Sequence, residues 1–352
     1  MRQPQPLPDS LGASFSVSEA KRAGVSARRL RHPGLDAPFW GVRARASTPT
    51  AEDDPVFDES PLAEEARLLT AAIRRLACAF AANAGEGCFF SHITAAVLWK
   101  LPVPVRELRK AVQLGDGQGE PGRSAAHGID VAVLAPRRAP KGAGVNGHEL
   151  APYLTALRTV DGLRVTSPAT TWAMLAPLLT VDELVRVGDA IVRIPRRRGM
   201  QRGDESDALG TREQLEAAMN AGRRHGVGRL RAALPMIRVG SASPGETDLR
   251  LACIRAGLPE PQLDIDVMDR SGVAIGYTEL AYPAWRVLIE YEGDHHRTDR
   301  AQWLRDIDKH AACIDAGWTV IRLTSRHVYP TGFAAVTRIR DALFRAGWRP
   351  AP

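Results

Sequence analysis

Acidic residues and histidines, the side chains that most often bind metal ions or move protons, are concentrated in residues 279–296, ELAYPAWRVLIEYEGDHH. Glu290 and Glu292 lie two positions apart in an apolar run, so a β-strand would direct both to one face. A hairpin turning at residues 283–285 would place Glu279 beside Glu290. Neighbouring carboxylates repel one another unless a cation lies between them. The pattern therefore predicts a site for Mg²⁺ or Mn²⁺, which accept oxygen ligands.

Two histidines, His295 and His296, follow the second strand of this hairpin. Histidine titrates near neutral pH, so either residue could act as a general base or protonate a leaving oxygen. A simpler interpretation also fits: the charges cover a solvated strand face and the histidines lie in a surface loop. The order of the surrounding elements favours the first interpretation.

These elements follow one another in a regular order. Ser243, followed by proline and an acid, is typical of a helix start, and Gly257 ends that helix. The predicted order is helix, three strands, helix, strand and helix, over residues 246–256, 262–268, 273–282, 286–292, 299–316, 318–323 and 331–346.

The phrases SPGETDLRLACIRAGLPEPQ, ELAYPAWRVLIEYEGDHHRTD and AGWTVIRLT, in this order, resemble the PD-(D/E)XK nuclease superfamily, in the branch related to very-short-patch repair endonucleases. The resemblance implies a restriction-endonuclease-like domain over residues 241–350. It also implies that Glu279 and Glu290 bind a metal ion. The side chains that it implies for catalysis are Glu246, Glu279, Glu290, Glu292, His295 and His296.

Two of these positions depart from the pattern of the superfamily. Glu279 and Glu292 stand where aspartate is common, and each adds one methylene group. Mg²⁺ demands near-ideal octahedral geometry, so longer side chains change where the ion would lie. The resemblance therefore implies the kind of site more strongly than its activity.

The N-terminal residues form a second predicted module, residues 13–45. Helices near Ser16–Gly24 and Ser26–His32, followed by a strand near residues 39–43, are typical of a winged-helix-like fold. A helical hairpin for protein contacts fits the same pattern. The segment GVSARRLRHPGLDAPFWGVRA resembles the N-terminal domain of AbiEi-type antitoxins, which favours DNA binding. The basic side chains expected at phosphates are those of Arg28, Arg29 and Arg31.

A mixed α/β middle domain is predicted for residues 61–194. The phrases SHITAAVLW and GLRVTSPATTWAMLA resemble the middle region of the same antitoxin family. Ser91 and His92 are adjacent, and adjacent residues rarely form a nucleophile and base, so we expect Ser91 to cap a helix and His92 to make a local hydrogen bond. Residues 137–147 are predicted to form a basic loop.

Residues 195–240 are predicted to form a basic linker and helix. The arginines at residues 196–198 fit either a solvated surface, which we favour, or a phosphate clamp. Arg305 and Lys309 lie one helical turn apart and are expected to contact a phosphate, although acidic neighbours also fit a salt-bridged surface.

The composition agrees with an anionic partner. The 352 residues carry a formal net charge of +7, and 44% of them are hydrophobic, enough for two or three domains of mixed α/β (α+β) class. The four cysteines have no metal-binding spacing, and we expect isolated buried thiols in a reducing cytoplasm. No signal peptide and no membrane span is recognised.

Together with the predicted cation site, the two resemblances imply a metal-dependent DNA endonuclease in a phage-defence or toxin–antitoxin context. The alternative is a non-enzymatic, DNA-binding regulator of the antitoxin type whose nuclease-like domain is degenerate. A third hypothesis is a nuclease that its own N-terminal half holds in check.

Overall fold

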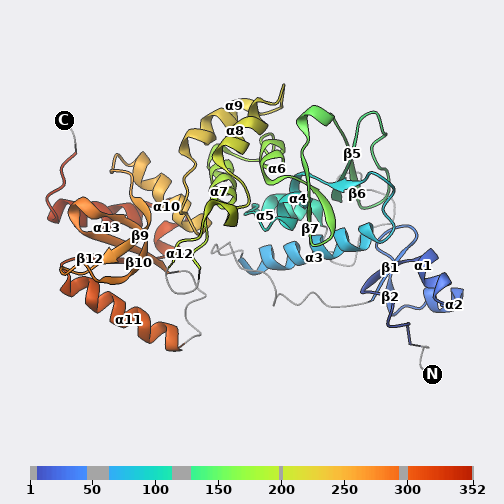
Figure 1. The fold of residues 1–352 in the computed structure, drawn as a ribbon, viewed down its shortest axis with the longest axis horizontal. Coiled ribbons are helices and arrows are strands. Elements are labelled where there is room, and N and C mark those ends of the chain that lie inside the picture. Colours follow the sequence, from blue (N-terminus) through green and yellow to red (C-terminus); the bar gives the residue numbers. More distant parts are fainter. Residues whose placement is uncertain (1–5, 46–62, 113–127, 198–200, 293–299, 351–352) are drawn as a thin grey trace. The chain divides into compact units, whose positions relative to one another are not determined.

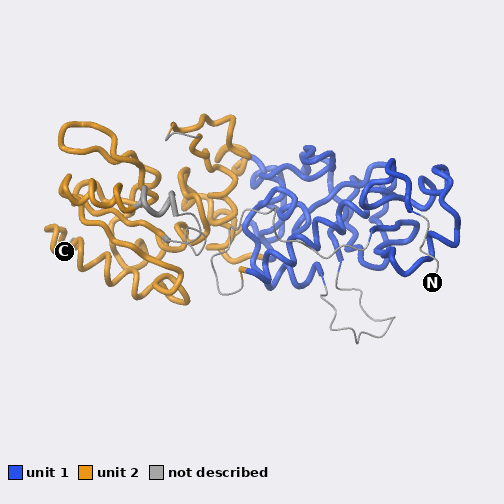
Figure 2. Tube along the Cα trace, turned by 90° about the horizontal axis from the view of Figure 1, so that it is seen from below, with its two compact units in different colours: residues 1–55, 64–178, 217–227 blue, residues 56–63, 179–216, 228–352 orange. Residues whose placement is uncertain are grey.

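The computed structural model describes residues 6–45, 63–112, 128–197, 201–292 and 300–350, without the side chains of residues 292 and 300–306. The described chain forms two compact units (Figure 2). Unit 1 contains the described parts of residues 1–55, 64–178 and 217–227, and unit 2 those of residues 56–63, 179–216 and 228–352. The predicted boundaries near residues 45, 194 and 240 divide the chain more finely and stay predictions.

Unit 1 begins with a small three-stranded sheet and two short helices (Figure 1). Ser16 and Ser26 accept hydrogen bonds from the third residues of their helices, which confirms both predicted starts. The predicted strand near residues 39–43 begins later, after Gly41, whose φ of +75° makes a turn. The elements are β1 (Ser14–Ser16), α1 (Val17–Arg22), α2 (Ala27–Leu30), β2 (Leu35–Asp36) and β3 (Val42–Arg45).

The rest of unit 1 is built on a five-stranded sheet in the order β6-β5-β4-β8-β7. The pairs β5–β6 and β4–β8 are parallel, and the other two are antiparallel. The predicted basic loop 137–147 is too long, because β6 begins at Val145. The elements are α3 (Ala63–Ala81), β4 (Phe89–Phe90), α4 (His92–Leu98), α5 (Val105–Ala111), β5 (Ile129–Leu134), β6 (Val145–Leu150), β7 (Leu157–Val160), β8 (Leu163–Thr166) and α6 (Pro168–Met174).

Unit 2 is built on a four-stranded mixed sheet in the order β12-β11-β10-β9. Strands β9, β10 and β11 are antiparallel in turn, and β12 is parallel to β11. The predicted order of elements is present, with one additional short helix, α12. The elements are α7 (Val181–Val192), α10 (Pro244–Arg255), β9 (Gln262–Met268), β10 (Ala274–Tyr282), β11 (Val287–Glu292), α11 (Arg300–Asp315), β12 (Thr319–Thr324), α12 (Ser325–Val328) and α13 (Phe333–Arg345); α8 (Arg212–Asn220) and α9 (Val227–Ala233) lie between α7 and α10.

The two faces of this sheet have different roles because strand side chains alternate. On one face, Leu280, Val287 and Ile289 pack in a large core with residues of α10 and α13. On the other face, a smaller core joins Ala281 and Leu288 to Cys313 of α11. The face toward α11 therefore has room for polar side chains beside a small apolar patch.

Two predictions about the whole chain can be compared with the described residues. In the described part of the chain, no helix combines the length and apolar character needed to span a membrane. The four cysteines are free, but only Cys253 and Cys313 are buried; Cys78 is exposed and Cys88 is half-buried. The expectation of buried thiols is therefore wrong for two of them.

Candidate functional site

Glu279 and Glu290 come together on the face of the unit 2 sheet toward α11. Leu280 of β10 pairs with Ile289 of β11, and the two glutamates are the next residues outward in that ladder. Glu279 Oε2 accepts a hydrogen bond from the backbone N–H of Tyr291 at 3.1 Å. The hairpin predicted from the sequence is thus present, and the turn is a short 3₁₀ segment, Pro283–Trp285.

A lysine from α11 neutralises Glu290. Lys309 Nζ lies 2.8 Å from Glu290 Oε1, and both side chains are largely buried, with 21% and 15% of their surface exposed. The stem of Lys309 lies along Gly276, where an added Cβ would be 3.4 Å from Lys309 Cδ. The predicted phosphate-binding lysine is therefore part of the carboxylate cluster itself.

Arg196 is a second cation near this cluster, beside β9. Its side chain is 9% exposed and contacts the carboxylates of Asp264 and Asp266, the latter at 2.7 Å from Nη1. It also donates from Nη2 to the backbone oxygen of Asp264 at 2.9 Å. Asp264 has a φ of +49°, a left-handed conformation that aspartate tolerates better than most residues. The expectation that the arginine run is solvated is therefore wrong for Arg196.

Tyr277 marks the point where these groups converge. The guanidinium of Arg196 lies 4.5 Å from the ring centroid, and Lys309 Nζ lies 5.5 Å from it, which are cation–π distances. Burial, and then the nearby carboxylate of Glu279, raises the pKa of the Tyr277 phenol. The tyrosine remains 41% exposed, so the cluster opens to solvent at this ring.

Glu246 lies in the first turn of α10, as predicted, and is 2% exposed. Its Oε2 accepts a hydrogen bond from the backbone N–H of Ala242 at 2.7 Å, while its own N–H donates to Ser243 Oγ at 3.3 Å. Burial raises the pKa of the Glu246 carboxyl to about 7, and the charge of Asp264 adds to the shift. The charge of Asp264 therefore acts on Glu246, whose own carboxylate oxygen stabilises the start of α10.

Several side chains predicted for the site are not described. Glu292 is the last residue of β11, but its side chain lies outside the description. His295 and His296 lie outside the described residues, as does the side chain of Arg305. Their predicted roles stay predictions.

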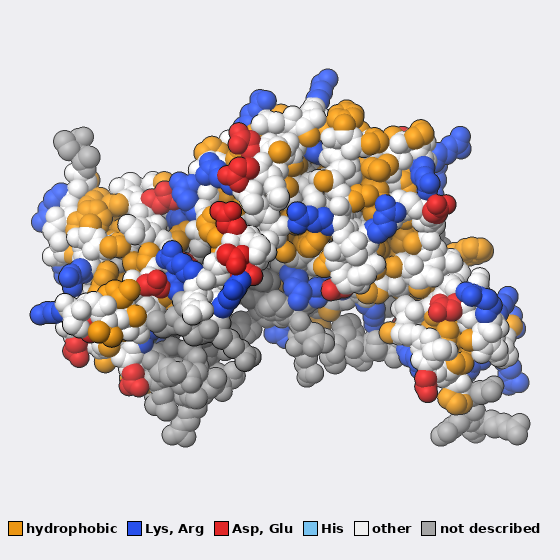
Figure 3. All heavy atoms as spheres, in the orientation of Figure 1, with side chains coloured by type: hydrophobic (Ala, Val, Ile, Leu, Met, Phe, Trp, Pro, Cys, Tyr) orange, Lys and Arg blue, Asp and Glu red, His pale blue; other side chains and the backbone are white. Residues whose placement is uncertain are grey.

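The arginines predicted to bind nucleic acid in unit 1 lie on or next to α2. Arg28 and Arg31 are exposed and Arg29 is half-buried. Lysine and arginine side chains are spread over the face shown in Figure 3 rather than gathered in one patch. The positions of the three arginines fit contact with phosphate groups, but the distribution of basic side chains does not indicate one surface for nucleic acid.

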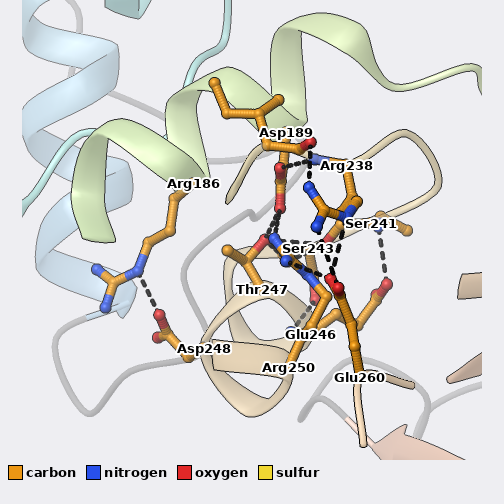
Figure 4. A network of polar contacts seen from close by, with 12 residues as sticks. Arg186, Asp189, Arg238, Ser241, Ser243, Glu246, Thr247, Asp248, Arg250 and Glu260 are labelled. Carbon is orange, nitrogen blue, oxygen red and sulfur yellow. Dashed lines mark hydrogen bonds and ion pairs between the residues drawn. The ribbon is translucent and has the colours of Figure 1, made fainter. Parts of the chain in front are cut away.

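A buried polar network, which the sequence did not reveal, anchors α10 to α7 (Figure 4). Arg250 of α10 is fully buried and contacts Asp189 of α7 at 2.9 Å and Glu260 at 3.1 Å. Asp189 also accepts hydrogen bonds from the Thr247 hydroxyl at 2.9 Å and the Arg238 backbone N–H at 2.8 Å. Because Glu246 and Thr247 are adjacent, this network fixes the helix turn that carries Glu246.

A sequence signal for the aspartates of β9, which the sequence analysis missed, was present. The strand LDIDV alternates aspartate and apolar residues, which directs Asp264 and Asp266 away from the apolar side chains. A paired cation is then expected, because such carboxylates are costly to bury alone. No local pattern indicated that Arg196, 68 positions from Asp264, would be that cation.

Ser91 and His92 in unit 1 agree with their prediction only in part. Ser91 Oγ and His92 Nδ1 lie 3.0 Å apart, which confirms the local hydrogen bond. Ser91 does not cap α4 with its side chain. Asp130 Oδ2 takes that place by accepting from the Ile93 N–H at 3.1 Å.

Two curated relatives are similar to this chain: the uncharacterized proteins Rv2248 and MT2308 of Mycobacterium tuberculosis, from strains H37Rv and CDC 1551. Each is 28% identical over 191 residues, which are 54% of this chain and 65% of the relative. The chain thus spans less than two thirds of the length of the curated relatives it matches. No family model and no solved structure matches.

Proposed function

We propose that unit 2 is a metal-dependent nuclease domain that hydrolyses phosphodiester bonds in DNA. The observation that carries the proposal is the pairing of Glu279 and Glu290 on adjacent strands, with Lys309 at 2.8 Å from Glu290 on the same face. The order helix, three antiparallel strands, helix and parallel strand supports the nuclease-like fold that the sequence resembles. A phage-defence or toxin–antitoxin context is part of this proposal.

The residues present fit a divalent cation of the magnesium type. Both carboxylates offer the hard oxygen ligands that such an ion prefers. Lys309 Nζ lies beside Glu290, so the ion would have to compete with it for this carboxylate. When bound, the ion would supply Lewis-acid activation of a phosphate oxygen and of a water molecule.

The other residues of the face would bind and orient the DNA strand. Lys309 can donate to a phosphate oxygen from its place beside Glu290. Tyr277, exposed and flanked by two cations, offers a ring face next to positive charge at the open side of the cluster. His295 or His296 would act as general base, and Arg28, Arg29 and Arg31 of unit 1 would bind DNA elsewhere.

The alternative, a regulator of the antitoxin type that binds DNA without cleaving it, has its own support. Arg196 engages Asp264 and Asp266, and Lys309 engages Glu290, so internal cations already neutralise these carboxylates. In that case the ion pairs would stabilise unit 2, and the carboxylates would not bind an ion. The two functions differ in whether added metal displaces Lys309 from Glu290.

The test is the binding of Mg²⁺ and Mn²⁺ by calorimetry, followed by nicking of supercoiled plasmid by the same protein. We expect Glu290→Gln to retain its fold and to lose at least about a hundredfold in nicking rate, the range seen when one charge-stabilising group is removed. Glu216→Gln, which changes an exposed glutamate of α8, is the matched control. Metal binding and nicking that persist in Glu290→Gln would refute the site, and absence of both in the wild-type protein would favour the regulator.

A further inference from the structure

Unit 1 contains a second cluster of chemically active side chains, which the proposed nuclease reaction does not use. His92, Asp130 and His148 each offer a ligand atom, and in the described chain these three atoms lie within 4.8 Å of one another. His92 begins α4, Asp130 lies on β5, and His148 lies on the neighbouring parallel strand β6. Three different elements therefore converge on one point of the five-stranded sheet.

The centre of the cluster is Asp130, which is 5% exposed. Its Oδ1 accepts from His148 Nε2 at 2.9 Å and from Asn146 Nδ2 at 2.7 Å, and its Oδ2 accepts from the Ile93 N–H. All of these donors are neutral groups or a histidine, in contrast to the arginines and lysine of unit 2. Among the described residues, these contacts of the carboxylate thus include no lysine or arginine.

The two imidazole rings are stacked, with centroids 4.1 Å apart and an interplanar angle of 29°. His92 has a φ of +46°, a conformation that non-glycine residues seldom adopt and that is often found at functional sites. Ser91 Oγ lies 3.0 Å from His92 Nδ1. If Nδ1–H donates to Ser91, as a ligand histidine commonly donates to an outer partner, Nε2 is left with its lone pair for an ion.

We propose that His92, Asp130 and His148 form a binding site for a divalent transition-metal ion, with Zn²⁺ as the preferred ion. Two nitrogens and one carboxylate oxygen are a ligand set that suits zinc better than magnesium. Zinc bonds of about 2.0–2.2 Å place ligand atoms of a tetrahedral site roughly 3.4 Å apart. The 2.9 Å between His148 Nε2 and Asp130 Oδ1 is close to that separation.

Binding requires a proton shift and a small movement of one ring. The ion replaces the proton between His148 and Asp130, and His148 then carries its proton on Nδ1. The ring of His92 turns out of the stack so that its nitrogen faces the same ion. The side chain of His148 is 23% exposed, so the ion can enter and water can fill the fourth position.

The test is calorimetric titration of the full chain with Zn²⁺, carried out in the Glu290→Gln background so that the carboxylates of unit 2 do not contribute. We expect one zinc ion per chain, and at least a thirtyfold weaker affinity in His148→Ala and in His92→Ala. His148 is half-buried on the edge strand β6, so its substitution is compatible with folding. His225→Ala, an exposed histidine of unit 1, is the matched control and should bind zinc like the parent.

Cobalt substitution gives a second readout that depends on coordination rather than affinity. Co²⁺ bound by two histidines and a carboxylate should give a visible absorption band that disappears in His148→Ala and persists in His225→Ala. No zinc binding to the parent protein, or zinc binding that His148→Ala leaves unchanged, would overturn the proposal. Because the site lies in unit 1, neither result depends on whether unit 2 cleaves DNA.

Discussion

Units 1 and 2 both bring polar side chains together on neighbouring strands, but they surround the carboxylates with different partners. In unit 2, Asp264, Asp266 and Glu290 are matched by Arg196 and Lys309. In unit 1, Asp130 is held by a backbone N–H, an amide and a histidine. The first arrangement is a set of fixed charges, and the second is one carboxylate among neutral donors.

This difference bears on which ion each of the two proposed sites would select. Oxygen ligands with cations nearby favour a hard ion that must compete with Lys309, whereas nitrogen ligands favour zinc and need only displace a proton. It also predicts different costs when a partner is removed, because an unpaired buried charge is more expensive than an unpaired neutral group. Four experiments test this contrast between the two units.

The largest effect is expected at the buried ion pair of unit 2. Asp189→Ala leaves Arg250, which is fully buried, without its closest partner, and should lower the free energy of unfolding of unit 2 by about 3–5 kcal/mol. Replacing both residues, as Asp189→Leu with Arg250→Met, should recover most of that loss. The measurement is scanning calorimetry of each variant, in which the unfolding transition of unit 2 is compared with that of unit 1. If Asp189→Ala were as stable as the wild type, the ion pair between Asp189 and Arg250 would not anchor α7 to α10.

The second effect is a pH dependence at Glu246. Burial raises the pKa of this carboxyl from 4.5 to about 7, so the folded state prefers it protonated. Stability from this group is fully present below pH 4.5 and falls as pH rises toward 7, by at most about 1.4 kcal/mol for each pH unit. Glu246→Gln should remove this slope, so the variant gains on the wild type between pH 5 and 8. If the free energies of unfolding of Glu246→Gln and of the wild type changed in the same way with pH, the buried carboxyl would not be protonated in the folded state.

The third effect separates the two proposed ion sites. Lys309→Met removes the cation that competes for Glu290, and should raise the Mn²⁺ affinity of unit 2 by about tenfold, which corresponds to ~1.4 kcal/mol. Zinc binding by unit 1 should not change. Calorimetry with each ion on the same sample gives the comparison. Weaker Mn²⁺ binding in Lys309→Met would mean that the lysine supports the site rather than competing for it.

The smallest effect compares two helix starts. Thr180 and Glu183 form a reciprocal capping box at α7, so Thr180→Ala should cost unit 2 about 1 kcal/mol. Ser91 makes no such cap at α4, so Ser91→Ala should cost unit 1 less than Thr180→Ala costs unit 2. The free energy of unfolding of each unit is measured by denaturant titration. If both substitutions lowered it equally, Ser91 would have a structural role beyond its contact with His92.

Local signals in the sequence were sufficient to place most elements of unit 2. The strand predicted at residues 262–268 is β9 with the same bounds, and the helix starting after Ser243 is α10. Such signals work because a cap, a glycine stop and a two-residue period each act over only a few positions. The same reasoning located the hairpin that joins Glu279 to Glu290.

Local patterns therefore predicted the order of elements from α10 to α13 and the carboxylates of β10 and β11. The tertiary structure decided which cations meet them, and which residues gather in unit 1. Arg250 meets Asp189 across 61 positions, and His148 meets Asp130 across 18, through packing that no local pattern encodes. The physical reason is that charge pairing between distant segments depends on how helices and sheets pack, and that is settled only when the whole core forms.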